Sequence, residues 1–93
     1  MIRDFASRET ERFFREGHCP AKWRGFAVAA GRKLDMIDAA TALGDLRSPP
    51  GNRLEALKGD LAGQWSIRIN QQWWVCFKWT DEGPEAVEIV DYH

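Results

Sequence analysis

The sequence predicts an α+β domain in which two helices pack on one face of an antiparallel sheet of three or four strands, preceded by a short N-terminal strand. Apolar and polar residues alternate from Trp65 to Trp79, with a break near residues 70–72, which is the pattern of a hairpin with one apolar face. Farther upstream, residues at steps of three and four form one stripe, typical of a helix that lies on a sheet. The stripe consists of Trp23, Phe26, Ala27, Ala30, Leu34, Ile37 and Thr41.

The N-terminal part begins with residues 2–6, which are the expected short strand. Ser7 is a suitable N-cap for a helix over residues 8–16, and Gly17 is a suitable stop. Pro20 disfavours helical geometry at the residue before it, so residues 18–20 are expected to connect this helix to the next.

The striped helix is expected from Lys22 to Ala42, with Leu43 and Gly44 ending it. Two prolines and a glycine in residues 45–52 then require an ordered loop or an extended segment.

The second half of the chain supplies the other strands. Residues 53–57 are expected to be extended, and glycines in residues 58–63 provide the turn that precedes the hairpin. A further turn at residues 81–84 leads to a last strand, residues 86–92, with Val87 and Ile89 on one face. We expect the helix from Lys22 to Ala42 to cover the hairpin face that carries Val75 and Phe77.

Length and composition indicate a single domain over residues 1–93, of the soluble globular class. The chain is 44% hydrophobic and 29% charged, without a run long enough to span a membrane. Residues 1–4 lack the layout of a secretory signal, so we expect a cytoplasmic protein without a membrane partner. Cys19 and Cys76 lie far apart and show no metal-ligand spacing, which predicts free thiols, no metal site and no cofactor.

Charge is unevenly distributed along the chain. The net charge of −1 argues against a strongly basic nucleic-acid-binding protein, because Lys and Arg contacts to phosphates supply most of that affinity. Residues 1–35 nevertheless contain eight basic and five acidic residues, whereas two basic and five acidic residues follow Leu61. This asymmetry permits a local basic patch, and solvated helix faces explain it equally well.

Several stretches resemble the HigB-type killer toxins of bacterial toxin–antitoxin systems, within the RelE/ParE superfamily. They are RKLDMIDAAT at residues 32–41, RSPPGNRLEALKGD at residues 47–60, GQWSIRINQQW at residues 63–73 and the terminal VEIVDYH at residues 87–93. The resemblance covers essentially the whole chain. It implies a RelE-like fold, neutralisation by a helix-turn-helix antitoxin of the HigA type, and ribosome-dependent cleavage of mRNA in the A site, which inhibits translation.

Such cleavage by the neighbouring 2′-hydroxyl, without a metal, needs a base, an acid and positive charge around the phosphate. The resemblance assigns active-site roles to Asp91, Tyr92 and His93: Asp91 orients or accepts a proton, Tyr92 stacks on or hydrogen-bonds the RNA, and His93 acts as base or acid. An imidazole, with an ordinary pKa of about 6.5, suits proton exchange at neutral pH. The structural alternative is a frayed terminal tripeptide with Tyr92 packed on the sheet.

Four basic residues are candidates for contacts to RNA phosphates. Arg68 alternates with Ile67 and Ile69, so it is expected on the face that the helices leave uncovered. Lys58 matches a functional lysine of the resembling toxins. Arg47 and Arg53 border the proline loop, where they either reach RNA or tie the loop down.

Two positions depart from the pattern of the resembling toxins. Glu55 stands where some of them have a catalytic histidine, and it could serve as a base or as an ordinary ion-pair partner. Trp74 stands where related toxins commonly have an arginine that stabilises transition-state charge. Tryptophan could stack on a base or pack structurally, but it cannot replace a guanidinium.

Three functions therefore remain open. The first is a ribosome-dependent endoribonuclease, which the DYH ending and Lys58 favour. The second is a binding inhibitor like the gyrase-poisoning branch of the same superfamily. The third is an attenuated toxin that only binds its antitoxin, which Trp74 and the acidic C-terminal third favour.

Overall fold

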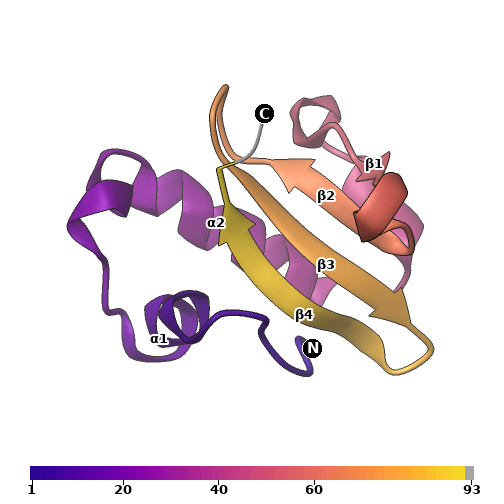
Figure 1. The fold of residues 1–93 in the computed structure, drawn as a ribbon, viewed down its shortest axis with the longest axis horizontal. Coiled ribbons are helices and arrows are strands. Elements are labelled where there is room, and N and C mark those ends of the chain that lie inside the picture. Colours follow the sequence, from indigo (N-terminus) through magenta and orange to yellow (C-terminus); the bar gives the residue numbers. More distant parts are fainter. Residues whose placement is uncertain (92–93) are drawn as a thin grey trace.

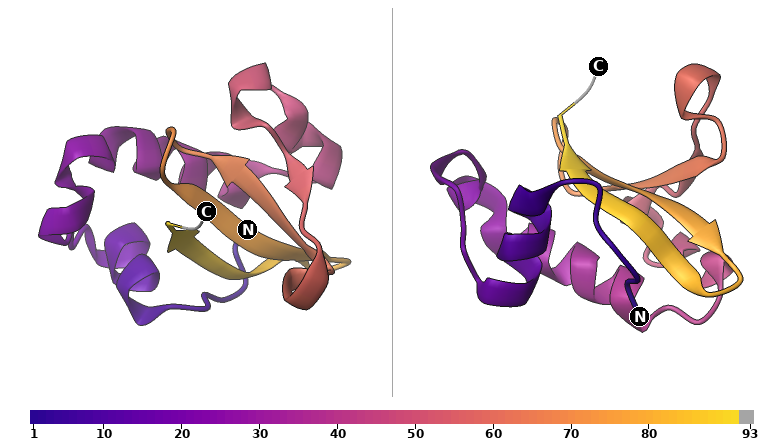
Figure 2. Two further views of the ribbon diagram at one scale, coloured as in Figure 1. Left: turned by 45° about the horizontal axis from the view of Figure 1, so that its top comes forward. Right: turned by 60° about the horizontal axis from the view of Figure 1, so that its bottom comes forward.

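A computed structural model describes residues 1–91 and shows a four-stranded antiparallel sheet with its helices on one face (Figures 1 and 2). The strands are β1 (Glu55–Ala56), β2 (Gln64–Arg68), β3 (Trp74–Thr80) and β4 (Gly83–Val90), in the order β1-β2-β3-β4. Helix α2 (Ala27–Ala39) crosses behind the sheet in the view of Figure 1. The predicted α+β class is confirmed, and we call the sheet face opposite α2 the open face.

Helix α1 (Arg8–Glu16) has the predicted bounds because both of its ends are set by local chemistry. The Ser7 hydroxyl accepts from the backbone N–H of Thr10, which satisfies a donor of the first turn. Gly17 ends the helix in the left-handed region at φ 72°, where glycine pays no Cβ penalty. The buried Thr10 hydroxyl also accepts from the N–H of Ile89, which fixes α1 to β4.

The second expected helix is divided and shorter than predicted. A 3₁₀ segment, η1 (Ala21–Phe26), precedes α2, and α2 ends at Ala39 instead of Ala42. Both helix types bring residues three or four apart onto one side, so the stripe did not separate them. The stripe also ends one residue early, since Ala40 is buried and Thr41 is exposed.

The expected strand over residues 2–6 is reduced to one parallel bridge between Phe5 and Val87. Three backbone hydrogen bonds join the segment to β4: Arg3 N–H to Pro84 O at 2.8 Å, Ala6 N–H to Val87 O at 3.0 Å and Val87 N–H to Asp4 O at 3.2 Å. The N-terminal segment therefore follows the β4 edge, as Figure 2 shows, without continuous strand pairing.

The proline-containing segment forms two 3₁₀ turns, η2 (Leu43–Arg47) and η3 (Pro50–Asn52), and a further one, η4 (Gly59–Leu61), follows β1. Asn52 is fully buried, and its side-chain amide donates to Leu46 O at 3.1 Å and Ser48 O at 3.3 Å. These bonds satisfy loop carbonyls away from water, and they order the segment that leads into β1.

The hairpin is formed as predicted, and its register separates two faces. Trp65 lies opposite Phe77, and Ile67 lies opposite Val75, all on the α2 side of the sheet. Val87 and Ile89 of β4 continue this side. A bulge at Ala86, with φ 52°, adds one residue to β4 opposite β3.

The core lies between α2 and this side of the sheet. A fully buried large apolar side chain contributes about 1.5–3 kcal/mol, so this layer dominates the stability of the fold. The core residues are Ile2, Trp23, Ala30, Leu34, Ile37, Ala40, Leu46, Ile67, Val75, Phe77, Val87 and Ile89. Among residues 1–91, no helix has the length and apolar character needed to cross a membrane.

Candidate functional site on the open face of the sheet

One row of side chains crosses all four strands of the open face. The register pairs Glu55 with Ser66, Ser66 with Cys76, and Cys76 with Glu88. Paired residues of antiparallel strands project to the same side, so these four share the face that α2 leaves uncovered. Ser66 and Cys76, in the middle of the row, are buried, and the two carboxylates stand at its ends.

A second row begins at Arg68, which lies opposite Trp74, and Trp74 lies opposite Val90. This confirms the predicted placement of Arg68 on the uncovered face. Arg68 Nε donates to the backbone oxygen of Asn70 at 2.9 Å, which holds the guanidinium near the β2–β3 turn. Arg68 and Trp74 therefore form a cation and an indole on neighbouring strands.

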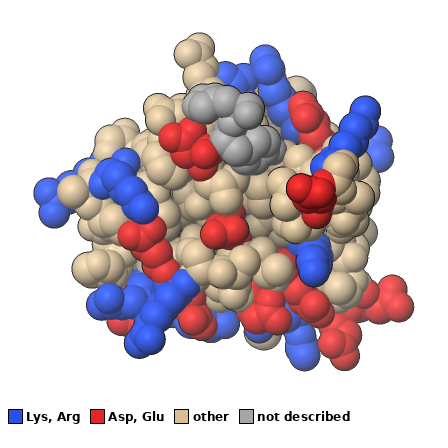
Figure 3. Space-filling view, in the orientation of Figure 1, with Lys and Arg blue, Asp and Glu red and all other residues tan. Residues whose placement is uncertain are grey.

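A hollow of about 480 Å³ opens on this face beside the two rows. Its charged side chains are Lys78, Glu88 and Asp91. The full lining is Ala6, Leu61, Gln64, Cys76, Lys78, Ala86, Glu88, Val90 and Asp91. From this side, the surface over β3 and β4 is mostly uncharged with a few Asp and Glu side chains, and both basic and acidic side chains surround it (Figure 3). The hollow can hold an apolar or planar group beside two carboxylates and one ammonium.

Asp91 follows β4 and is held beside the β2–β3 turn. Its carboxylate accepts from Gln72 Nε2 at 2.9 Å. The turn itself is closed by Asn70, whose side-chain oxygen accepts from the N–H groups of Gln72 and Trp73 at 2.8 and 2.9 Å. Tyr92 and His93 lie outside the described residues.

Glu55 and Lys58 lie toward the other side of the open face. Both are exposed. Three strand spacings of about 4.8 Å separate β1 from β4, so Glu55 stands roughly 14 Å from Glu88 along the first row. Lys58 precedes η4, whose Leu61 lines the hollow, but Lys58 itself is not part of the lining.

Arg47 and Arg53 come together at a different place. They line a hollow of about 270 Å³ with Pro50, Leu54 and Trp65. Trp65 lies opposite Phe77, on the α2 side of the sheet. The structure thus groups these two arginines with each other and with Trp65, and it does not place them in the rows of the open face.

Two ionisable groups near the proline loop are shifted by their surroundings. Burial lowers the pKa of Lys33, whose ammonium donates to the Asn52 side-chain oxygen. Backbone N–H groups of Thr41 and Ala42, at 3.0 and 3.1 Å, lower the pKa of Asp45 because they stabilise its carboxylate. The first interaction joins α2 to η3, and the second joins the residues that follow α2 to η2.

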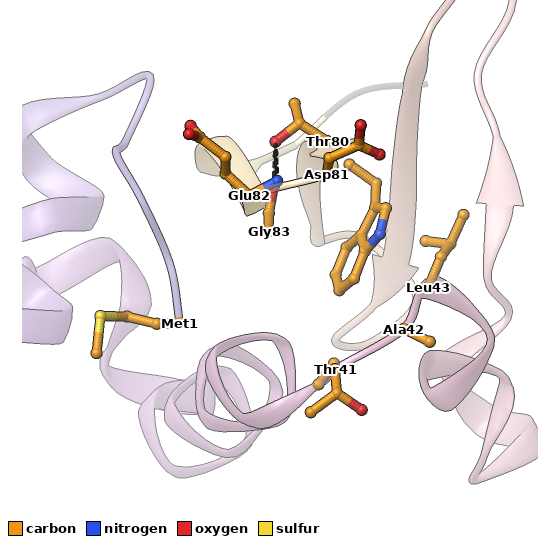
Figure 4. A pocket seen from close by; sticks show the side chains of 10 residues that line it. Met1, Thr41, Ala42, Leu43, Thr80, Asp81, Glu82 and Gly83 are labelled. Atoms are coloured by element: carbon orange, nitrogen blue, oxygen red, sulfur yellow. Dashed lines mark hydrogen bonds between the residues drawn. The ribbon is translucent and has the colours of Figure 1, made fainter.

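A third hollow, of about 510 Å³, opens between Met1, residues 40–43 and the β3–β4 turn (Figure 4). Asp81 and Glu82 lie on its rim, and the lining contains no Lys or Arg. The Thr80 hydroxyl donates to Gly83 O at 3.0 Å and closes the turn. This acidic hollow repels a phosphate, and it lies at the opposite end of β4 from Asp91.

The sequence reasoning did not single out Lys78 and Glu88 as site residues. Both alternate with core residues of their strands, so the same period of two that placed Arg68 would have placed them on the open face. Within residues 1–91, no group of three or more His, Cys, Asp or Glu side chains is arranged to hold a metal ion.

The sequence has clear relatives. Residues 3–93 match the profile of the family described as RelE-like toxin of type II toxin-antitoxin system HigB. The chain is 56% identical to Toxin HigB-1 of Vibrio cholerae over 50 residues, which are 54% of this chain and 53% of that protein. It is 28% identical to Endoribonuclease HigB of Proteus vulgaris over the full length of both.

The chain is also 50% identical to an uncharacterized protein of Haemophilus influenzae, over 48% of that protein. It therefore spans about half the length of this relative and of Toxin HigB-1. Among solved structures, the YoeB/ParE toxin from Agrobacterium tumefaciens shares the fold. Its TM-score is 0.53 and its sequence identity 18%, with 99% of this chain and 96% of that chain covered. The predicted RelE-like architecture is therefore confirmed.

Proposed function

Because this chain belongs to the RelE-like toxins of the HigB type, we propose that it is a toxin that cleaves mRNA in the ribosomal A site. We further propose that a helix-turn-helix antitoxin of the HigA type neutralises it. The observation that supports cleavage best is the hollow on the open face, which lies between Asp91 and the basic side chain of Lys78. The toxin acts in the cytoplasm in this proposal, where its ribosomal substrate lies.

Substrate binding is assigned to cations and one indole. Arg68 holds a phosphate, since its guanidinium offers several donors in a planar fork. Trp74, directly opposite, stacks on a base, an interaction worth about 1–3 kcal/mol. Arg47 and Arg53 contact the RNA farther along.

The chemical step is attack of the 2′-oxygen on the adjacent phosphorus. A base takes the 2′-hydroxyl proton as the oxygen–phosphorus bond forms, the bond to the 5′-oxygen breaks, and an acid gives that oxygen a proton. The products are a 2′,3′-cyclic phosphate and a 5′-hydroxyl. Asp91 and His93 share the proton transfers, Tyr92 holds the nucleotide, and Lys58 adds positive charge. Glu55, on the β1 side of the open face, is the alternative base.

The test is a purified translation reaction in which the 5′ ends of the mRNA are mapped by primer extension. Addition of the protein is expected to produce cuts within the codon in the A site, and none on the same mRNA without ribosomes. Equal cutting without ribosomes would contradict ribosome dependence. Adding a helix-turn-helix antitoxin of the HigA type is expected to abolish the cuts.

A second candidate is an attenuated toxin that binds its antitoxin and cleaves poorly. Trp74 favours it, because an indole supplies no positive charge to a phosphate. The two carboxylates in the hollow also outnumber Lys78. A gyrase poison of the same superfamily would instead inhibit DNA supercoiling, so a supercoiling assay beside the translation reaction separates these functions.

A further inference from the structure

The hollow lined by Arg47, Arg53 and Trp65 is separate from the two rows of the open face. We propose that it binds one nucleotide of single-stranded RNA, with the phosphate on the two guanidinium groups and the base against Trp65. This inference rests on the proposed function, because it adds a second contact to the same RNA. The two contacts lie on different faces of the sheet: the hollow is on the α2 side, whereas the proposed cleavage site is on the open face.

The position of the hollow follows from strand geometry. Trp65 and Ser66 are neighbours in β2, so their side chains project to opposite faces. Ser66 belongs to the first row of the open face, and Trp65 points to the side where η3 contacts β2. The short strand β1 forms the edge between the two faces, and an RNA strand that crosses this edge reaches both sites.

The charge of the hollow favours an anion. Arg47 and Arg53 are both exposed, and neither forms an ion pair with a described residue. By contrast, Arg12, Arg15 and Lys22 near α1 each have a carboxylate oxygen within 3.6 Å. Two uncompensated like charges around one hollow repel each other, and a bound phosphate removes that repulsion.

The carboxylate nearest to Arg47 in sequence has other partners. Asp45 accepts from the backbone N–H groups of Thr41 and Ala42 and from the Thr41 hydroxyl at 3.2 Å. It therefore caps the start of η2, and it forms no ion pair with Arg47.

The shape and chemistry suit a nucleotide. Guanidinium groups bind phosphate oxygens through paired hydrogen bonds, and tryptophan stacks on any base. At about 270 Å³ the hollow is slightly below the range of about 300–1,000 Å³ typical of ligand pockets. It thus has room for one base and its phosphate instead of a larger folded RNA element.

The two arginines are also held in place before a ligand arrives. Asn52, 0% exposed, lies between them in sequence and binds the carbonyls of Leu46 and Ser48. Arg53 itself has φ 48° and donates its N–H to Pro50 O at 3.1 Å. A loop ordered in advance loses less entropy on binding.

The experiment is an NMR titration of the whole ¹⁵N-labelled protein with a 2′-O-methyl RNA hexanucleotide. This probe cannot be cleaved, and no ribosome is present, so the result does not depend on catalytic activity. We expect the indole N–H resonance of Trp65, assigned through Trp65→Phe, to shift and saturate. If the Trp65 resonance shifts and saturates but the protein does not cleave mRNA in the translation reaction, the proposed function is refuted and the nucleotide site is not.

Charge variants supply the matched comparison. Arg47→Gln with Arg53→Gln should weaken binding about tenfold or more and reduce the slope of log K against log salt by about 0.7, the value for one phosphate on a single strand. Arg24→Gln with Arg32→Gln removes the same charge from the exposed side of η1 and α2, and should weaken binding by no more than about twofold. Equal losses in both pairs, or no shift of Trp65, would overturn the site.

Stacking and ligand class are tested in the same way. Trp65→Leu should weaken binding about 5- to 150-fold, whereas Trp65→Phe should retain most of it, because a base stacks on either aromatic ring. Inorganic phosphate that saturates the site as tightly as the oligonucleotide would contradict the base contact. A hexaglutamate peptide that binds as tightly would show that the site takes an acidic protein segment, and would overturn the RNA assignment.

Discussion

Arg68 lies directly opposite Trp74 in the register between β2 and β3, on the open face of the sheet. One cation and one indole therefore share the place where a phosphate is expected to lie. We predict that Trp74→Arg raises the rate of mRNA cleavage on ribosomes about tenfold or more, because a guanidinium beside the phosphate stabilises the charge of the transition state.

The matched control is Trp74→Gln, which removes the indole without adding charge. Cleavage rates are measured from single-turnover primer extension on stalled ribosomes. If Trp74→Arg and Trp74→Gln cleave at the same rate as the unchanged protein, Arg68 already supplies the positive charge and our expectation for position 74 is wrong.

The anchor of the proline loop is predicted to be energetically important. Asn52→Leu keeps the approximate volume but leaves the Leu46 and Ser48 carbonyls without their donor. We expect a loss of about 1–3 kcal/mol in the free energy of unfolding, the usual cost of an unsatisfied buried polar group. Urea unfolding measures it, and a change below about 0.5 kcal/mol would show that the loop is held by other contacts.

The link between α2 and η2 is predicted to weaken in acid. The folded-state pKa of Asp45 is below its ordinary value of 3.8, so its carboxylate stabilises the fold above that pH. This contribution is lost as the pH falls through the folded-state pKa. The free energy of unfolding of the unchanged protein minus that of Asp45→Asn should therefore shrink below pH 3.8.

The control for this measurement is Asp81→Asn, at an exposed turn carboxylate that accepts no hydrogen bond among the described residues. The free energy of unfolding of the unchanged protein minus that of Asp81→Asn should vary less between pH 7 and the lowest pH measured. A flat difference for Asp45→Asn would contradict the role given to the Thr41 and Ala42 N–H groups.

The β3–β4 turn is predicted to require glycine at one position. Gly83 has φ 116°, and a Cβ there would lie 3.1 Å from the Met1 carbonyl oxygen. Gly83→Ala should lower the free energy of unfolding by about 1–3 kcal/mol. Gly44→Ala is the control, because that glycine has no atom near its added Cβ, and it should change stability by no more than about 0.5 kcal/mol.

Features of the fold that depend on residues close together in the sequence were predictable from local patterns. Ser7 and Gly17 set both ends of α1, and alternation with Val75 and Phe77 set the hairpin faces. The division of the second helix at Phe26 was not predictable in the same way, because 3₁₀ and α segments share a stripe of three- and four-residue steps.

The candidate site was predictable only in part, because it depends on which strands become neighbours. The period of two placed Arg68 on the uncovered face, but the four-strand row that ends at Glu55 and Glu88 follows from the strand order. The meeting of Arg47 and Arg53 with Trp65 depends on how η2 and η3 fold against β2, which no short pattern specifies.

The central claim is that the open face, at its Asp91 end, carries out RNA cleavage. The most direct test is a purified translation reaction with three proteins. They are the unchanged protein, the double variant Asp91→Ala/His93→Ala, and the double variant Asp81→Ala/His18→Ala, a control of equal composition. We predict cuts in the A-site codon for the unchanged protein and the control, and a loss of at least about 100-fold for the Asp91 and His93 variant. Undiminished cleavage by that variant would contradict the claim.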